Sequence, residues 1–278
     1  MTTEEAAMQP LKIYTPEYYA RIRALEDRHW WYAGMRAIAA ALLRSERPQD
    51  RPGRFLDAGC GTGAAMAWAR SVARAGSVAG IDVSAYALAF CRERGERALS
   101  QASVMELPFR NASFDVVLCN DVLQHLPTDG GDLRALEEIH RVLGPGGALL
   151  VRTNSALGIP HGERTDHDFQ RYRLDGVAAR MQSAGFVVKR ASYVNALPAV
   201  YATFKSRLRP PRHSGHHAHG HESTSAYQGL GVRENIANRP LLNRALTWIL
   251  SQEARYLARP GRRLPFGHTI VCLAVKSH

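Results

Sequence analysis

Apolar runs and helical patterns alternate through the middle of the chain. Each apolar run has the length of a buried strand, and most are followed by a stretch with apolar side chains at helical spacing. We predict strands near residues 54–58, 78–82, 99–103, 114–119 and 147–153, and helices near 64–74, 85–95 and 132–143. Repeated strand–helix–strand units require right-handed crossovers and a parallel sheet. A ligand of such a sheet is expected at the carboxyl ends of its strands.

Further patterns extend this core on both sides. Residues 16–47 carry apolar and aromatic side chains at helical spacing and predict two helices laid over the sheet. Residues 209–228 are rich in Pro, His, Gly and Ser and almost lack apolar side chains, so we predict a disordered loop there. Beyond the central core we also predict helices near 174–184 and 239–258, and strands near 186–191 and 268–275.

A glycine turn follows the first predicted strand. Gly59, Gly61 and Gly63 let the backbone approach a ligand, and the helix after them presents N–H groups to a carboxylate or phosphate. This spacing also satisfies the dinucleotide pattern, so the glycines alone do not separate a nicotinamide cofactor from others. Asp57 would repel a pyrophosphate but favour a ligand with an ammonium and a sulfonium, and S-adenosylmethionine carries both. Asp82, at the end of the second strand, can take both hydroxyls of a ribose.

Three later stretches add to the glycine turn. Residues 107–109 read Leu-Pro-Phe, residues 114–126 run from a buried strand into His125, and residues 138–147 end in Pro-Gly-Gly. In order and spacing, residues 54–153 resemble the class I S-adenosylmethionine-dependent methyltransferases. The resemblance implies an α/β fold with a Rossmann-like, doubly wound sheet of seven strands, the last of them antiparallel.

The resemblance also implies how the cofactor is held. Asp57 and the backbone near the three glycines contact the methionine part, with the carbonyl of Asn120 for its ammonium, and Asp82 contacts the ribose. Near adenine the family usually has an acidic residue, whereas this chain has Ser103, whose hydroxyl can hydrogen-bond to the adenine amino group. Further adenine contacts are expected from Val83, Val104 and Met105.

Several residues are candidates for catalysis and for the acceptor. His125 follows the fourth strand and is the first candidate base; the alternative is that it caps a helix and packs on the sheet. The polar stretch 161–172 follows the fifth strand, where loops usually line the acceptor pocket, and it offers His167 as a second base. From it we expect Arg171 and Tyr172 to contact the acceptor. The cluster His-Trp-Trp-Tyr at 29–32 resembles the leader of many bacterial small-molecule methyltransferases, and Trp31 either roofs a pocket or packs in the core.

Charge and composition bear on the partners, the metal content and the location of the protein. The formal charge is +11, and residues from Tyr201 onward hold 12 Lys or Arg against 3 Glu. This basic region is either a solvated surface or an attraction for RNA, an anionic membrane or an acidic substrate. The four cysteines lack metal or disulfide spacing, and a catalytic metal is not expected at the histidine-rich tract 213–221. Without a long apolar run or a basic leader, we expect a cytoplasmic protein with no membrane span.

We therefore expect four segments and one main function. The segments are an N-terminal helical lid (1–47), a cofactor-binding core (48–192), a helical cap insertion (193–266) that includes the 209–228 loop, and the final core strand (267–278). The predicted function is methyl transfer from S-adenosylmethionine to an O or N atom of a small-molecule acceptor, because the long aromatic cap favours an enclosed pocket. The alternatives are an RNA or protein methyltransferase recruited by the basic region, and a catalytically silent partner subunit that binds the cofactor.

Overall fold

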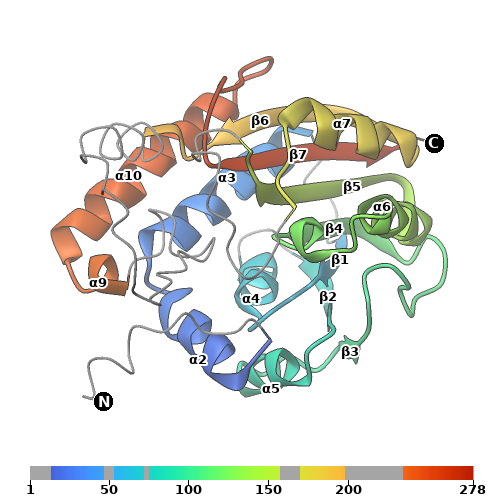
Figure 1. Ribbon diagram of the computed structural model, residues 1–278, viewed down its shortest axis with the longest axis horizontal. Helices are drawn as coiled ribbons and strands as arrows, with labels where there is room; N and C mark the ends of the chain where they lie inside the picture. The colour runs from blue at the N-terminus through green and yellow to red at the C-terminus, as the bar shows by residue number, and fades with distance from the viewer. Residues whose placement is uncertain (1–13, 47–52, 72–74, 157–169, 198–233, 278) are drawn as a thin grey trace, which may run out of the picture.

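Seven strands form a single sheet in the part of the chain that the structure describes (Figure 1). The computed structural model describes residues 14–46, 53–71, 75–156, 170–197 and 234–277. The strands are β1 (Gly53–Ala58), β2 (Ala75–Asp82), β3 (Leu99–Gln101), β4 (Phe114–Asn120), β5 (Leu143–Asn154), β6 (Phe186–Val194) and β7 (Thr269–Lys276). Their order is β3-β2-β1-β4-β5-β7-β6. Strands β1 to β5 pair in parallel, whereas β7 runs antiparallel between β5 and β6, so the predicted seven-stranded sheet is confirmed.

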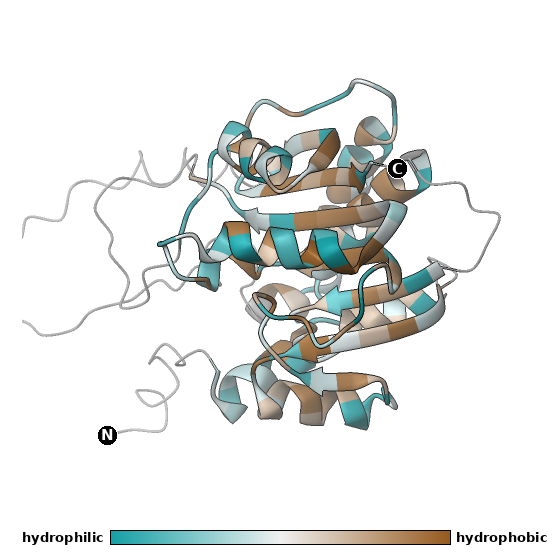
Figure 2. Ribbon diagram, turned by 90° about the vertical axis from the view of Figure 1, so that its right-hand side faces the viewer, coloured by the Kyte–Doolittle hydropathy of each residue, from teal (hydrophilic) through white to brown (hydrophobic). Residues whose placement is uncertain are grey.

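Helices cover both faces of the sheet. They are α2 (Pro16–Leu25), α3 (Trp30–Glu46), α4 (Ala64–Ser71), α5 (Ala85–Glu93), the 3₁₀ helix η1 (Leu123–His125), α6 (Gly131–Val142), α7 (Leu174–Ser183), α9 (Glu234–Ala237) and α10 (Pro240–Leu257). Because neighbouring side chains of a strand point to opposite faces, β4 contributes to two cores. Val117 packs with α6 and α7, whereas Val116 packs with α3, α4, α5 and α10. Figure 2 shows the result, with mostly hydrophobic strands inside helices that carry both hydrophilic and hydrophobic residues.

The N-terminal helices are held by α10. Gly34 of α3 faces Leu250 of α10 so closely that a Cβ on Gly34 would lie 2.2 Å from the Leu250 Cδ1 atom. Asn243 of α10 reaches the connection between α2 and α3: its Oδ1 accepts the N–H of Trp30 at 2.8 Å, and its Nδ2 donates to the carbonyl of Arg28 at 2.9 Å. Helix α10 therefore holds α3 and the connection before it in place. We call α2 and α3 together the lid.

Several predicted strands have different ends in the structure: β2 starts three residues earlier and β6 ends three residues later than predicted. Strand β3 stops at Gln101 instead of residue 103, because Gln101 opposes Asp82 and the partner strand β2 ends there. Strand β5 starts at Leu143, before the predicted turn at 145–147, because Leu143 already pairs with Phe114 of β4. The turn is present as an irregularity within β5, where Gly146 has a φ of 71°. The predicted loop 209–228 lies outside the described residues.

Candidate active site

The glycine turn between β1 and α4 is tied to the end of β2. The N–H groups of Gly59 and Cys60 donate to the carbonyl of Ile81 at 2.9 and 2.8 Å. Gly59 has a φ of 90°, and a Cβ there would lie 2.3 Å from the Val122 Cγ2 atom, so a larger residue does not fit. A Cβ on Gly61 would meet nothing within 4 Å. The turn is thus fixed at its first glycine and open at its second.

Two cavities meet at this turn. The larger has a volume of about 290 Å³ and the smaller of about 120 Å³. Both are lined by Ile22 of the lid helix α2, by Gly59 and Gly61, and by Asn120 and Asp121 at the end of β4. A ligand with two different ends can therefore extend from one cavity into the other.

The larger cavity contains the residues predicted for ribose and adenine. Asp82 lines it at the end of β2, where one carboxylate oxygen accepts the N–H of Gly61 and the other that of Ser84, both at 2.9 Å. Burial raises the pKa of Asp82, and these N–H groups oppose the rise. The same cavity is lined by Val83, Ser103, Val104 and Met105. Residues from the ends of β2 and β3 thus line one cavity, and their contacts with a cofactor stay a prediction.

Asp57 lines the smaller cavity without a partner. It is 2% exposed, and neither of its carboxylate oxygens has a hydrogen-bond partner among the described residues. Burial raises the pKa of Asp57 to about 8, although the positive charge of Arg152 acts against the rise. Buried polar groups are nearly always satisfied, because an unpaired one retains its full desolvation cost. The smaller cavity therefore fits a ligand that brings a cation or a hydrogen-bond donor to Asp57.

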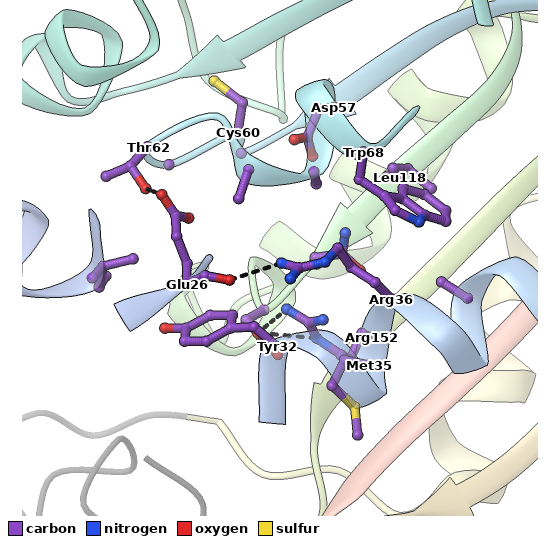
Figure 3. A pocket seen from close by; sticks show the side chains of 18 residues that line it. Glu26, Tyr32, Met35, Arg36, Asp57, Cys60, Thr62, Trp68, Leu118 and Arg152 are labelled. Atoms are coloured by element: carbon purple, nitrogen blue, oxygen red, sulfur yellow. Dashed lines mark hydrogen bonds and ion pairs between the residues drawn. The ribbon is translucent and has the colours of Figure 1, made fainter. Parts of the chain in front are cut away.

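Arg36 of α3 lines the same cavity (Figure 3). Its Nη1 donates to the carbonyl of Glu26 at 2.9 Å, and no ion pair joins its guanidinium to a carboxylate of the described residues. Burial lowers the pKa of Arg36, and the charges of Asp27 and Glu26 oppose this. Arg36 is not among the site residues that the sequence predicts. Its spacing of four from Tyr32, which also lines the cavity, was the available signal, because such residues share one face of a helix.

A buried polar network fixes the lid to the glycine turn. Glu26, the residue after α2, accepts hydrogen bonds from the Thr62 hydroxyl and, at 2.6 Å, from Arg94 Nη2. Arg94 follows α5, and its Nε donates to the carbonyl of Thr62 at 2.8 Å. The same guanidinium also pairs with Asp27. These contacts join the lid, the turn and α5 into one unit.

Arg152 borders the smaller cavity from the end of β5. Its Nη2 lies 2.6 Å from a carboxylate oxygen of Asp121, and its guanidinium carbon lies 4.8 Å from the ring centroid of Trp31. Asp121 has a φ of 57°, a left-handed conformation that non-glycine residues rarely adopt and that clusters at functional sites. Trp31 is 8% exposed and lines neither cavity. Of the two interpretations of Trp31, the structure favours core packing, with Arg152 stacked on its ring.

One of the two predicted bases lies in the described part of the chain. His125 is in η1, directly after β4, and lines the larger cavity. Its ring centroid lies 6.3 Å from that of Tyr14, which precedes α2 and lines the same cavity. The second predicted base, His167, lies outside the described residues.

Three other predicted residues lie away from both cavities. A Cβ on Gly63 would be 3.1 Å from the Cys91 Sγ atom, so this glycine allows packing against α5. Tyr172 is buried, and its hydroxyl lies 3.1 Å from a carboxylate oxygen of Asp132. This placement does not support the predicted acceptor contact of Tyr172. Arg171 is exposed and lines neither cavity.

The family comparison agrees with this geometry. Residues 56–151, which run from β1 to β5 and include the glycine turn, match the protein family described as "Methyltransferase domain". Residues 56–151 belong to this methyltransferase-domain family. With the sheet order, the match identifies a class I S-adenosylmethionine-dependent methyltransferase domain.

Relatives of the methyltransferase domain differ in what their names say they act on. A protein of Mycolicibacterium smegmatis named "Probable S-adenosylmethionine-dependent methyltransferase" is 29% identical over 172 residues, which are 60% of this chain and 63% of the relative. A human protein named "Probable tRNA methyltransferase 9B" is 30% identical over 122 residues, which are 44% of this chain and 26% of the relative. The chain thus spans less than two thirds of the length of these two curated relatives.

A solved structure shares the fold over nearly the whole chain. It is a complex from Haloferax volcanii between the Trm112 methyltransferase activator and a methyltransferase. The match has a TM-score of 0.59 at 19% identity and covers 94% of this chain and 95% of that chain. Among the residues that the structure describes, no helix is long and apolar enough to cross a membrane.

Proposed function

We propose that the chain binds S-adenosylmethionine across both cavities and transfers its methyl group to an acceptor. The observation that carries this proposal is the pair of side chains in the smaller cavity, the unpartnered Asp57 carboxyl group and the Arg36 guanidinium. An amino acid presents one ammonium and one carboxylate, which match these two side chains by charge and by hydrogen bonding. Asp57 would accept from the ammonium, and Arg36 would donate to the carboxylate.

The larger cavity suits the nucleoside end of the same molecule. Asp82 already accepts two backbone N–H groups, but two carboxylate oxygens provide about four acceptor sites, so ribose hydroxyls can be added. Val83, Val104 and Met105 offer apolar contacts to a planar base, and the Ser103 hydroxyl a polar one. The residues shared by the two cavities would then surround the sulfonium.

The chemistry needs positioning more than acid–base catalysis. When bound, the cofactor supplies an electrophilic methyl group on a good leaving group. Holding the acceptor in line can contribute about 7–11 kcal/mol. Where the acceptor atom carries a proton, a base adds roughly 10²–10⁴-fold. We propose His125 for that role because it lines the larger cavity.

We propose an O or N atom of a small molecule as the acceptor. Tyr14, Tyr18 and Tyr19 line part of the larger cavity. This aromatic lining favours a small ligand that the cavity can enclose. The buried network of Glu26 and Arg94 holds this lid against the glycine turn. His167 and Arg171 remain predictions for the acceptor side.

RNA is the second candidate acceptor. It is favoured by the basic region after Tyr201 and by the human relative that is named as a tRNA methyltransferase. A silent subunit that only binds the cofactor is the third possibility, and a fold neighbour solved in complex with an activator makes a missing partner worth testing.

Labelled methyl transfer separates these candidates. Purified protein would be incubated with methyl-labelled S-adenosylmethionine and, separately, with small metabolites, RNA and protein from the source cells. We expect label in the metabolite fraction, and its mass would identify the acceptor. Label in RNA or protein would overturn the small-molecule assignment, and label in none would favour a missing partner or a silent subunit.

The base can be tested once an acceptor is known. His125→Asn keeps the size of the side chain but removes the basic nitrogen, so turnover should fall by about 10²–10⁴-fold with unchanged cofactor affinity. His140→Asn, in α6 and outside both cavities, is the matched control and should leave turnover unchanged. Full turnover of His125→Asn under saturating substrates would rule out its role as base.

A further inference from the structure

Helix α10 exposes a stripe of apolar and basic side chains on the side that faces away from the sheet. Leu241, Arg244, Trp248 and Arg255 recur at intervals of three, four and seven residues, so they lie along one face of the helix. Leu241 is 81% exposed and Trp248 is 63% exposed, whereas Leu250 on the opposite face is buried against α3. Figure 1 shows α10 at the edge of the molecule, with α3 on its inner side. We call this stripe the outer face of α10.

The exposed charges of residues 239–263, which include α10, have one sign. The only acid between residues 239 and 263 is Glu253, which is buried and accepts the N–H groups of Asn195 and Ala196 at 2.7 and 2.9 Å. Six arginines of the same stretch are exposed, and none of them forms an ion pair with a described carboxylate: Arg239, Arg244, Arg255, Arg259, Arg262 and Arg263. The outer face thus combines exposed apolar side chains with uncompensated positive charge.

We propose that the outer face of α10 binds an anionic phospholipid surface. The arginines would lie against lipid phosphates, which attract basic residues close to a membrane. Trp248 has the amphipathic ring that is enriched at membrane interfaces, and Leu241 would enter the acyl boundary. A nucleic acid would match the charge but offers Leu241 no apolar phase, so the exposed leucine favours a lipid surface over RNA.

This attachment would be peripheral and independent of methyl transfer. The outer face of α10 contributes no residue to either cavity. Its inner face holds the lid through Asn243 and Leu250, so the helix would join the membrane-bound side of the protein to the cofactor site.

Vesicle flotation with the full chain tests the proposal. We expect the protein to bind vesicles of phosphatidylcholine mixed with phosphatidylglycerol at least about tenfold more tightly than vesicles of phosphatidylcholine alone, and to release at high salt. The tryptophan emission should shift to shorter wavelength on binding, and Trp248→Ala should abolish that shift.

Charge reversal provides the matched comparison. Arg244→Glu/Arg255→Glu should weaken binding to the anionic vesicles by more than about tenfold. Arg92→Glu/Arg110→Glu changes two exposed arginines elsewhere by the same charge and should bind like the wild type. An equal loss of vesicle binding in both double variants would overturn the proposal, and so would equal binding of the wild type to neutral and anionic vesicles. It would also be overturned if the wild type bound no vesicles and Arg244→Glu/Arg255→Glu instead lost binding to RNA.

Discussion

The ionisation of Asp57 should make cofactor binding depend on pH. Burial raises its pKa to about 8 in the ligand-free protein, so below that pH the carboxyl is mostly protonated and cannot pair with an ammonium. Binding must then release a proton. We expect the affinity for S-adenosylmethionine to rise by up to about tenfold per pH unit between roughly pH 6 and 8. Isothermal titration calorimetry in buffers of different ionisation enthalpy counts the released proton.

Asp57→Asn is the matched variant for this effect. It keeps the shape but carries no charge, so the affinity should fall and the pH dependence between pH 6 and 8 should disappear. The same change should stabilise the ligand-free protein, and more at pH 8 than at pH 5. A raised pKa favours the protonated form in the folded state, so the cost of ionised Asp57 grows as the pH rises toward 8. An unchanged pH profile of binding would contradict the assignment of the ammonium to Asp57.

Arg36 should recognise the carboxylate of the cofactor. Arg36→Met removes the guanidinium and should weaken S-adenosylmethionine binding by about 10- to 100-fold, as expected for a lost charge-assisted hydrogen bond. Decarboxylated S-adenosylmethionine lacks that carboxylate but keeps its ammonium, so its affinity should hardly change in Arg36→Met. Asp57→Asn should weaken both ligands. If Arg36→Met weakened the two ligands equally, Arg36 would act on something other than the carboxylate.

The site residues divide by how far their positions depend on tertiary packing. The positions of Asp57, Asp82 and the first two glycines follow from strand ends and turn geometry, so the sequence motif was sufficient to place them at the cavities. Arg36 was missed because its place depends on how α3 packs over the turn. Asp121 was missed because its left-handed backbone has no signature in the residue type. The placement of Trp31 under Arg152 likewise depends on a contact between distant segments.

At the scale of elements, the contact of α3 with α10 should limit the size of residue 34. A Cβ on Gly34 would lie 2.5 Å from the Leu250 Cβ atom, and that part of the side chain cannot rotate away. The clash in Gly34→Ala should therefore lower the free energy of unfolding by about 1–3 kcal/mol. The higher helix propensity of alanine should offset up to about 1 kcal/mol of this loss. Chemical denaturation measures the change.

Two further variants make this test specific. Gly176→Ala in α7 has only the end of the Arg180 side chain nearby, at 3.5 Å, and should be neutral or stabilising. Leu250→Ala should reduce the cost of Gly34→Ala in the double variant, because the Cγ and Cδ1 contacts are gone and only the Cβ contact remains. Additive losses in the double variant would show that residue 34 does not act through Leu250.

Element positions were predictable where the signal is local. The alternation of apolar runs and helical stretches placed the parallel strands and the crossover helices, and the resemblance supplied the antiparallel β7. The ends of β3 and β5 were not predictable, because they are set by partner strands that end or begin at Asp82 and Phe114. The four-residue helix α9 and the single turn η1 are too short to carry a periodic signal.

At the scale of the whole molecule, the helices α2 and α3, which precede the methyltransferase domain, line part of the two cavities. The lid supplies Ile22 and Arg36 to the cavities, and α10 holds the lid in place through Asn243. Cofactor affinity and the stability of the lid should therefore be coupled. A sheet of five parallel strands without these helices would lack this coupling. Helices α2, α3 and α10 lie outside the part matched by the family, residues 56–151.

Direct titration of S-adenosylmethionine into the purified protein tests the central claim. We expect saturable binding of one molecule per chain, weakened at least about tenfold in Asp82→Ala, because the ribose hydroxyls lose their acceptor. Asp129→Ala, an exposed carboxylate outside both cavities, should bind like the wild type. Absence of binding to the wild type, or unchanged affinity in a folded Asp82→Ala variant, would contradict the account.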